Sequence, residues 1–125
     1  MIQVYKVFDP VFKCEFRLFC NGSGKEFLSA IKPYIADLSQ FEDCESYPGI
    51  TAICDSGAIC IYMPNLNHDD PRHIGILAHE CVHAMQRRVW ERCGVKENEW
   101  EVSAYYVEFL LTEFLNKIKK GNKKK

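Results

Sequence analysis

The stretch ILAHECVHAMQ, residues 76–86, places two histidines four positions apart and a glutamate directly after the first. Residues four apart lie on the same side of a helix, one turn above each other, so His79 and His83 can direct their imidazoles at one ion. Glu80 lies about 100° further round the helix, where it can accept a proton from a water molecule beside that ion. The stretch therefore predicts a helix with two metal ligands and a general base. The alternative is a structural helix that carries two histidines without binding a metal.

The same helix carries apolar residues at spacings of three and four, which predicts a stripe buried against a sheet. Cys81 falls within this stripe, so we expect it in the core rather than at a metal. Asp70 followed by Pro71 is typical of a helix start, and Gly94 of a helix end. The helix is therefore expected from about residue 71 to residue 92, with His73 in its first turns or on the surface.

The remaining elements follow from local patterns. Alternating, β-branched and aromatic segments interrupted by turn residues predict two hairpins. Between them, Ser23 and Glu26 form a capping-box pattern before a helix that bends at Pro33. A last helix follows the turn after Gly94. The expected strands are residues 2–8, 12–20, 50–55 and 58–64, and the other expected helices are residues 24–38 and 97 or 98 to 119. This order of elements predicts an α+β fold.

Composition predicts one globular domain, residues 1–116, followed by a lysine-rich flexible tail, residues 117–125. The tail holds six lysines, whereas the rest of the chain has ten basic and 17 acidic side chains. No arginine or aromatic residue accompanies the tail lysines to read bases, which argues against a nucleic-acid partner. We interpret the tail as solvated.

Apolar runs too short for a bilayer, and the lack of a signal sequence, argue against secretion or a membrane partner. The seven cysteines are odd in number and form no C-x-x-C pair. This pattern favours reduced thiols packed as small apolar groups, and hence a cytoplasmic protein.

Hydrolytic zinc sites typically have three protein ligands and one open position. The last helix carries an apolar stripe that we expect to be buried and that includes Val102, Tyr106, Phe109, Leu110, Leu115 and Ile118. Glu101 lies near the start of that helix, at the border of the stripe, where an antiparallel neighbour would present His83. It is therefore the favoured third ligand. Glu97, Glu108 and the absence of any glutamate ligand remain alternatives. Imidazole and carboxylate ligands with an open position favour zinc, and manganese and iron also accept these ligand types.

Two motifs, HECVH at residues 79–83 and EVSAY at residues 101–105, give the chain a family resemblance. It resembles the gluzincin metallopeptidases, and it is similar to the small zinc peptidases of bacteriophage and prophage genomes. The resemblance implies a small zincin-like fold with a short, mainly antiparallel sheet, a backing helix, an active-site helix and a glutamate helix. It also implies a zinc-dependent peptidase acting on a peptide or protein, with residues 58–64 as the edge strand beside the cleft.

The resemblance does not extend to the larger C-terminal subdomain of full-sized gluzincins, which often supplies a Tyr or His that holds the oxyanion. Tyr62, His68, Tyr105 and Tyr106 are the candidates for that role in this chain. The alternative function is a weak or inactive zincin-fold module that binds a host or regulatory protein. A further possibility is a peptidase that cleaves a single regulatory protein.

Overall fold

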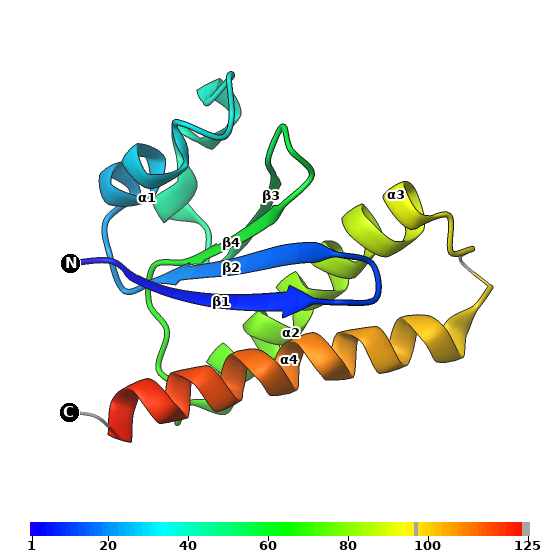
Figure 1. Cartoon of the computed structure of the whole chain (residues 1–125). Coiled ribbons are helices and arrows are strands. Elements are labelled where there is room, and N and C mark those ends of the chain that lie inside the picture. Colours follow the sequence, from blue (N-terminus) through cyan, green and yellow to red (C-terminus); the bar gives the residue numbers. More distant parts are fainter. Residues whose placement is uncertain (97, 124–125) are drawn as a thin grey trace.

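The computed structural model describes residues 1–96 and 98–123 as a four-stranded mixed sheet between two layers of helices (Figure 1). The strand order is β1-β2-β4-β3. Both predicted hairpins are confirmed, because β1 pairs with β2 and β3 with β4 in antiparallel fashion. The central pair, β2 and β4, is parallel. The strands are β1 (Gln3–Asp9), β2 (Cys14–Cys20), β3 (Ile50–Ile53) and β4 (Ile59–Met63). The predicted α+β class is confirmed.

The prediction that residues 58–64 form an edge strand is wrong. The strand β4 lies inside the sheet between β2 and β3, and all five of its residues are buried. A strand covered on both faces is expected to be continuously apolar, as ICIYM nearly is. The edge strand on this side of the sheet is β3, whose residues are mostly half-buried.

One face of the sheet is covered by α1 (Gly24–Ile31). Phe27 of this helix stacks on Tyr62 with ring centroids 4.4 Å apart, and it meets Phe19 edge-on. The predicted capping box is confirmed, since the side chains of Ser23 and Glu26 each accept a hydrogen bond from the other's backbone N–H.

The prediction that this helix continues to residue 38 is wrong, because α1 ends at Ile31, two residues before Pro33. Proline lacks the N–H that would continue the helix, and its ring clashes with the carbonyl four residues earlier. The chain then forms two short 3-10 turns, η1 (Ser39–Phe41) and η2 (Cys44–Ser46), on its way to β3.

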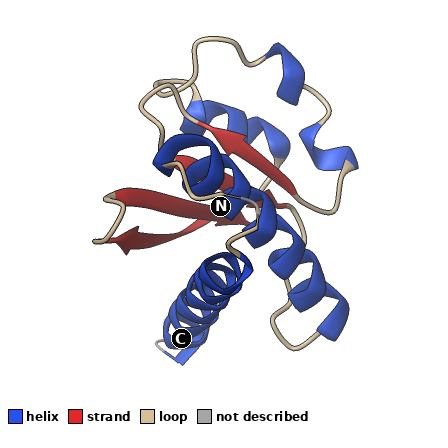
Figure 2. Cartoon of the chain, turned by 90° about the vertical axis from the view of Figure 1, so that its right-hand side faces the viewer, coloured by secondary structure: helices blue, strands red, loops and turns tan. Residues whose placement is uncertain are grey.

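The opposite face of the sheet is covered by α2 (Pro71–Met85) and α4 (Trp100–Lys123), which lie side by side (Figures 1 and 2). The helix α2 packs against β4 and β3, whereas α4 packs against β1. The main core lies between these helices and the sheet. Its fully buried members include Phe16, Leu18, Ile61, Leu77, Cys81, Leu110 and Phe114. The prediction that Cys81 belongs to the core is confirmed.

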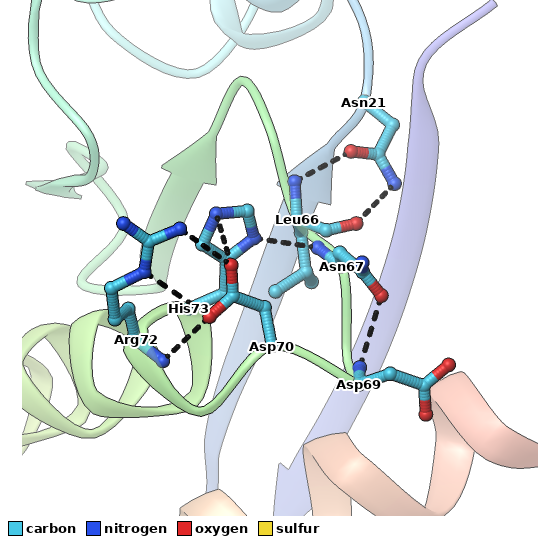
Figure 3. A network of polar contacts seen from close by, with 7 residues as sticks. All are labelled: Asn21, Leu66, Asn67, Asp69, Asp70, Arg72 and His73. Atoms are coloured by element: carbon cyan, nitrogen blue, oxygen red, sulfur yellow. Dashed lines mark hydrogen bonds and ion pairs between the residues drawn. The ribbon is translucent and has the colours of Figure 1, made fainter.

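The start of α2 is fixed by side chains, as predicted from Asp70 and Pro71 (Figure 3). Asp70 is the N-cap residue, and its carboxylate accepts the backbone N–H of Arg72 at 2.9 Å. His73 lies in the first turn, where its Nδ1 accepts the backbone N–H of Asn67 at 2.8 Å. These contacts join the helix to the loop that precedes it and so set where the HECVH motif falls.

Asn21 holds the other end of that loop to the end of β2. Its Oδ1 accepts the backbone N–H of Leu66 at 2.7 Å, and its Nδ2 donates to the carbonyl of Leu66 at 3.1 Å. Asn21 has a φ of 58°, a left-handed conformation that asparagine tolerates better than most residues. The loop is therefore held at both ends.

Beyond Met85 the helical path continues as a π-helical turn, η3 (Gln86–Trp90), and a short α3 (Glu91–Cys93). Gly94 then ends it with a φ of 75°, as predicted. The helix α4 continues through Lys123 with Ile118 buried. The tail predicted from residue 117 is thus helical as far as residue 123, and residues 124–125 lie outside the described residues.

Candidate metal centre

His79 and His83 lie on the outer face of α2 with their side chains exposed. Their Nε2 atoms are 3.1 Å apart, and the two rings are nearly perpendicular, at 82°. With zinc–nitrogen distances of about 2.0–2.1 Å, this separation gives an angle of roughly 100° at a shared ion, near the tetrahedral value of about 109°. The predicted pair of imidazoles therefore fits one metal ion.

A third side chain contacts this pair from the π-helical turn. The Nδ1 of His83 is 3.3 Å from the Oε1 of Gln86. An amide oxygen accepts hydrogen bonds only, so this contact favours the tautomer with the proton on Nδ1. That tautomer leaves Nε2 free to bind a metal, in the manner of the outer-shell partners of metal-binding histidines.

Glu80 faces the edge strand rather than solvent, and its residue is only 5% exposed. Thr51 of β3 donates from Oγ1 to the Oε1 of Glu80 at 2.8 Å, and the same hydroxyl lies 3.3 Å from the backbone carbonyl oxygen of Glu80. The Glu80 carboxylate is thus held at one orientation beside the imidazole pair, as a general base requires.

His79, Glu80 and His83 line one cavity of about 410 Å³ between α2, β3 and the segment that holds η1 and η2. Phe41 and Tyr47 of that segment form an aromatic wall. Arg87, one turn beyond His83, supplies a positive charge at the same cavity. The arrangement combines metal-ligating groups, a carboxylate and an apolar wall, which are typical of a small-molecule or peptide site.

The structure does not bring Glu101 to the histidines. In the described parts of the chain, no group of three or more His, Cys, Asp or Glu side chains could hold a metal ion. Glu101 is exposed on the first turn of α4. Among the alternatives, Glu108 is also exposed on α4, and Glu97 lies outside the described residues. The two imidazoles are therefore the part of the predicted ligand set that the structure assembles.

Glu101 lies away from the two histidines because of the rotation of α4 about its axis. The buried residues of α4 are Ser103, Tyr106, Leu110, Phe114 and Ile118. The sequence pattern instead predicted a stripe that included Val102, which is 40% exposed. Ser103 follows Glu101 by two residues, or about 200° around the helix, so Glu101 faces away from the packed side of α4.

None of the four predicted oxyanion candidates lines the cavity. Tyr62 is buried on the other side of the sheet, where its hydroxyl donates to the carbonyl of Gly22 at 2.8 Å and burial raises its pKa to about 12. Tyr105 and Tyr106 lie on α4 beside the turn between β1 and β2. The tyrosine that does line the cavity is Tyr47.

Sequence reasoning also missed Thr51, Tyr47, Gln86 and Arg87. Gln86 and Arg87 lie three and four residues after His83, which is a usable signal once the helix is assigned. Thr51 and Tyr47 reach the cavity only through tertiary packing. No local pattern marks them.

Comparisons of the chain with protein-family models, with curated proteins and with solved structures give no match. No helix in the described residues is long and apolar enough to cross a membrane.

Proposed function

We propose that this protein is a zinc-dependent peptidase of zincin-like fold, in which His79 and His83 hold the ion and Glu80 is the general base. The observation that carries the proposal is the convergence of two Nε2 atoms, 3.1 Å apart, in the cavity that Glu80 also lines. A sheet whose edge strand runs beside the HECVH helix supports the zincin-like part of the proposal.

His79 and His83 would hold the zinc ion, which would supply a Lewis acid that polarises a peptide carbonyl and acidifies water. The chain's own contribution is the proton transfer and the orientation of the groups. Glu80 accepts the proton of the attacking water and returns it to the leaving amine. Thr51 and the packing around Glu80 hold the carboxylate in place for both transfers.

A peptide or protein substrate is supported by the form of the cavity. The edge strand β3 offers backbone groups to which an extended peptide can add as a further strand. Phe41 and Tyr47 offer apolar contacts for one of its side chains. We also propose a cytoplasmic location, because the seven cysteines are unpaired thiols, which suits a reducing compartment.

A second candidate function is a zincin-fold module that recognises a host or regulatory protein without cleaving it. The observation that favours it is the position of Glu101, because a two-histidine site lacks the third protein ligand typical of hydrolytic zinc. A peptidase restricted to one regulatory protein is intermediate between the two candidates. It would be inactive on generic peptides.

Metal analysis and peptide hydrolysis separate these candidates. The peptidase proposal expects one zinc per chain and chelator-sensitive cleavage of a mixed peptide library. Glu80→Gln should retain the metal and lose cleavage, whereas His79→Ala and His83→Ala should lose both. Gly75→Ala is the matched control, because a Cβ at this α2 position meets no atom within 4 Å. Cleavage that persists in Glu80→Gln would refute the assigned base, and a metal-loaded protein without cleavage would favour the binding module.

A further inference from the structure

We infer that Thr51 of the edge strand β3 and Gly49, the residue before that strand, are the positioning residues for the general base Glu80. This inference deepens the proposed peptidase function and depends on it for its catalytic meaning. The single orientation of the Glu80 carboxylate that it predicts can be measured in the absence of metal.

The first observation is the hydrogen bonding of Thr51. Its hydroxyl donates to the Oε1 of Glu80 at 2.8 Å and lies within 3.3 Å of the carbonyl oxygen of the same residue. These contacts span 29 positions in the sequence, and they fix both the backbone and the side chain of Glu80 to one strand. A hydroxyl–carboxylate hydrogen bond is among the stronger kinds in proteins.

The second observation is the space at Gly49. A Cβ built on Gly49 would lie 3.0 Å from the Cγ of Glu80 and 3.2 Å from its Oε2. The same Cβ would lie 3.1 Å from the Cγ2 of Ile76, one turn earlier on α2. A larger residue at position 49 would therefore crowd the Glu80 side chain and force it to shift.

Thr51 and Gly49 together define the orientation of the Glu80 carboxylate from both sides. Thr51 holds Oε1 by a hydrogen bond, while the bare backbone of Gly49 leaves room for Cγ and Oε2. Unlike the two histidines of the HECVH motif, which are exposed, Glu80 is turned away from solvent. Its position thus depends on β3 more than on α2 alone.

Four variants test the inference. Thr51→Val keeps the shape and removes the donor, and Thr51→Ser keeps the donor and removes the methyl group. Gly49→Ala adds the Cβ beside Glu80. Gly75→Ala adds a Cβ on α2 where nothing lies within 4 Å, and so controls for a general effect of alanine. Thermal unfolding of each variant establishes that it is folded.

The structural readout is the rotamer of Glu80 in crystal structures of the metal-free protein. We expect one rotamer in the unaltered chain, in Thr51→Ser and in Gly75→Ala, and a displaced or multiple side chain in Thr51→Val and Gly49→Ala. An unchanged Glu80 rotamer in both Thr51→Val and Gly49→Ala would overturn the inference. Because this readout needs neither zinc nor substrate, it decides the inference even where the protein proves to bind no metal.

The kinetic readout separates positioning from a structural role. We expect kcat to fall about 10- to 100-fold in Thr51→Val, the size expected for misplacing a catalytic group. KM and zinc affinity should be unchanged in this variant, and kcat should recover in Thr51→Ser. An equal kcat in Thr51→Val and the unaltered chain would overturn the positioning role. A chain that holds no zinc and cleaves nothing refutes the proposed function, and the Glu80 rotamer then decides whether Thr51 and Gly49 orient the carboxylate.

Discussion

The indole Nε1 of Trp90 donates a hydrogen bond to the Oγ of Ser103 at 2.7 Å. This contact joins the π-helical turn after α2 to the first turn of α4. It agrees with the rotation of α4 that places Ser103, Tyr106 and Leu110 on the buried face of the helix. Glu101, about 200° from Ser103 around the helix, therefore faces the opposite way. This bond and the buried face of α4 together account for the absence of Glu101 from the imidazole pair.

From this geometry we expect Glu101→Gln to leave zinc affinity unchanged. His79→Ala should lower zinc affinity by more than the roughly 10- to 100-fold that is typical of mutating a residue that contacts a metal ligand but not the metal. Isothermal titration with zinc measures both. A loss in Glu101→Gln as large as that in His79→Ala would show that α4 rotates to complete the ligand set when zinc binds. Glu108→Gln, another exposed carboxylate on α4, is the control.

Gln86 provides a second test of the metal centre. Its Oε1 is 3.3 Å from the Nδ1 of His83, so it favours the tautomer that leaves Nε2 free. We expect Gln86→Leu to weaken zinc binding about 10-fold, the lower end of the usual outer-shell effect, without a large change in thermal stability. Affinity equal to that of the unaltered chain would mean that this contact does not orient the His83 ring.

The parts of the fold that could be predicted from sequence are those fixed by local chemistry. The Ser23–Glu26 capping box, the Asp70–Pro71 helix start and the Gly94 helix end depend on residues a few positions apart, and the structure has all three. Each hairpin likewise depends on one turn and two adjacent strands.

The parts that could not be predicted depend on long-range packing. The parallel pairing of β2 with β4 moves β4 from the edge to the centre of the sheet, and nothing local marks it. Placing Val102 instead of Ser103 in the buried stripe of α4 is an error of one residue. Because Tyr106 and Leu110 of the predicted stripe are buried, the error is confined to the start of the helix, where the buried face is turned away from Glu101.

The hydroxyl of Tyr106 joins α4 to the end of β1, where it donates to the Oδ2 of Asp9 at 2.6 Å. Asp9 is 3% exposed, so the Tyr106→Phe variant leaves a buried carboxylate short of one donor. We expect it to lower the free energy of unfolding by about 1–3 kcal/mol, as measured by urea denaturation. Tyr105→Phe, at a neighbouring residue that is 65% exposed, should change the free energy of unfolding by no more than about 0.5 kcal/mol.

Glu26 should make the stability of α1 depend on acid pH. The backbone N–H of Ser23 and that of Ile2 both donate to its carboxylate, at 3.1 and 2.8 Å, and these bonds hold the pKa of Glu26 below its ordinary value of 4.5. The unfolded chain then binds a proton more readily than the folded one as the solution becomes acidic. The stabilisation is therefore complete above the ordinary pKa and is lost as pH falls through the folded pKa.

Glu26→Gln keeps the shape of the side chain and removes its charge. We expect the variant to unfold at a lower urea concentration than the unaltered chain at about pH 7. The gap between the two should narrow as the pH falls below 4.5 and the native carboxylate becomes protonated. Glu42→Gln, at an exposed residue of the loop before β3, is the matched control. A gap that stays constant across this range would mean that hydrogen bonding to a neutral side chain, rather than to a carboxylate, stabilises the start of α1.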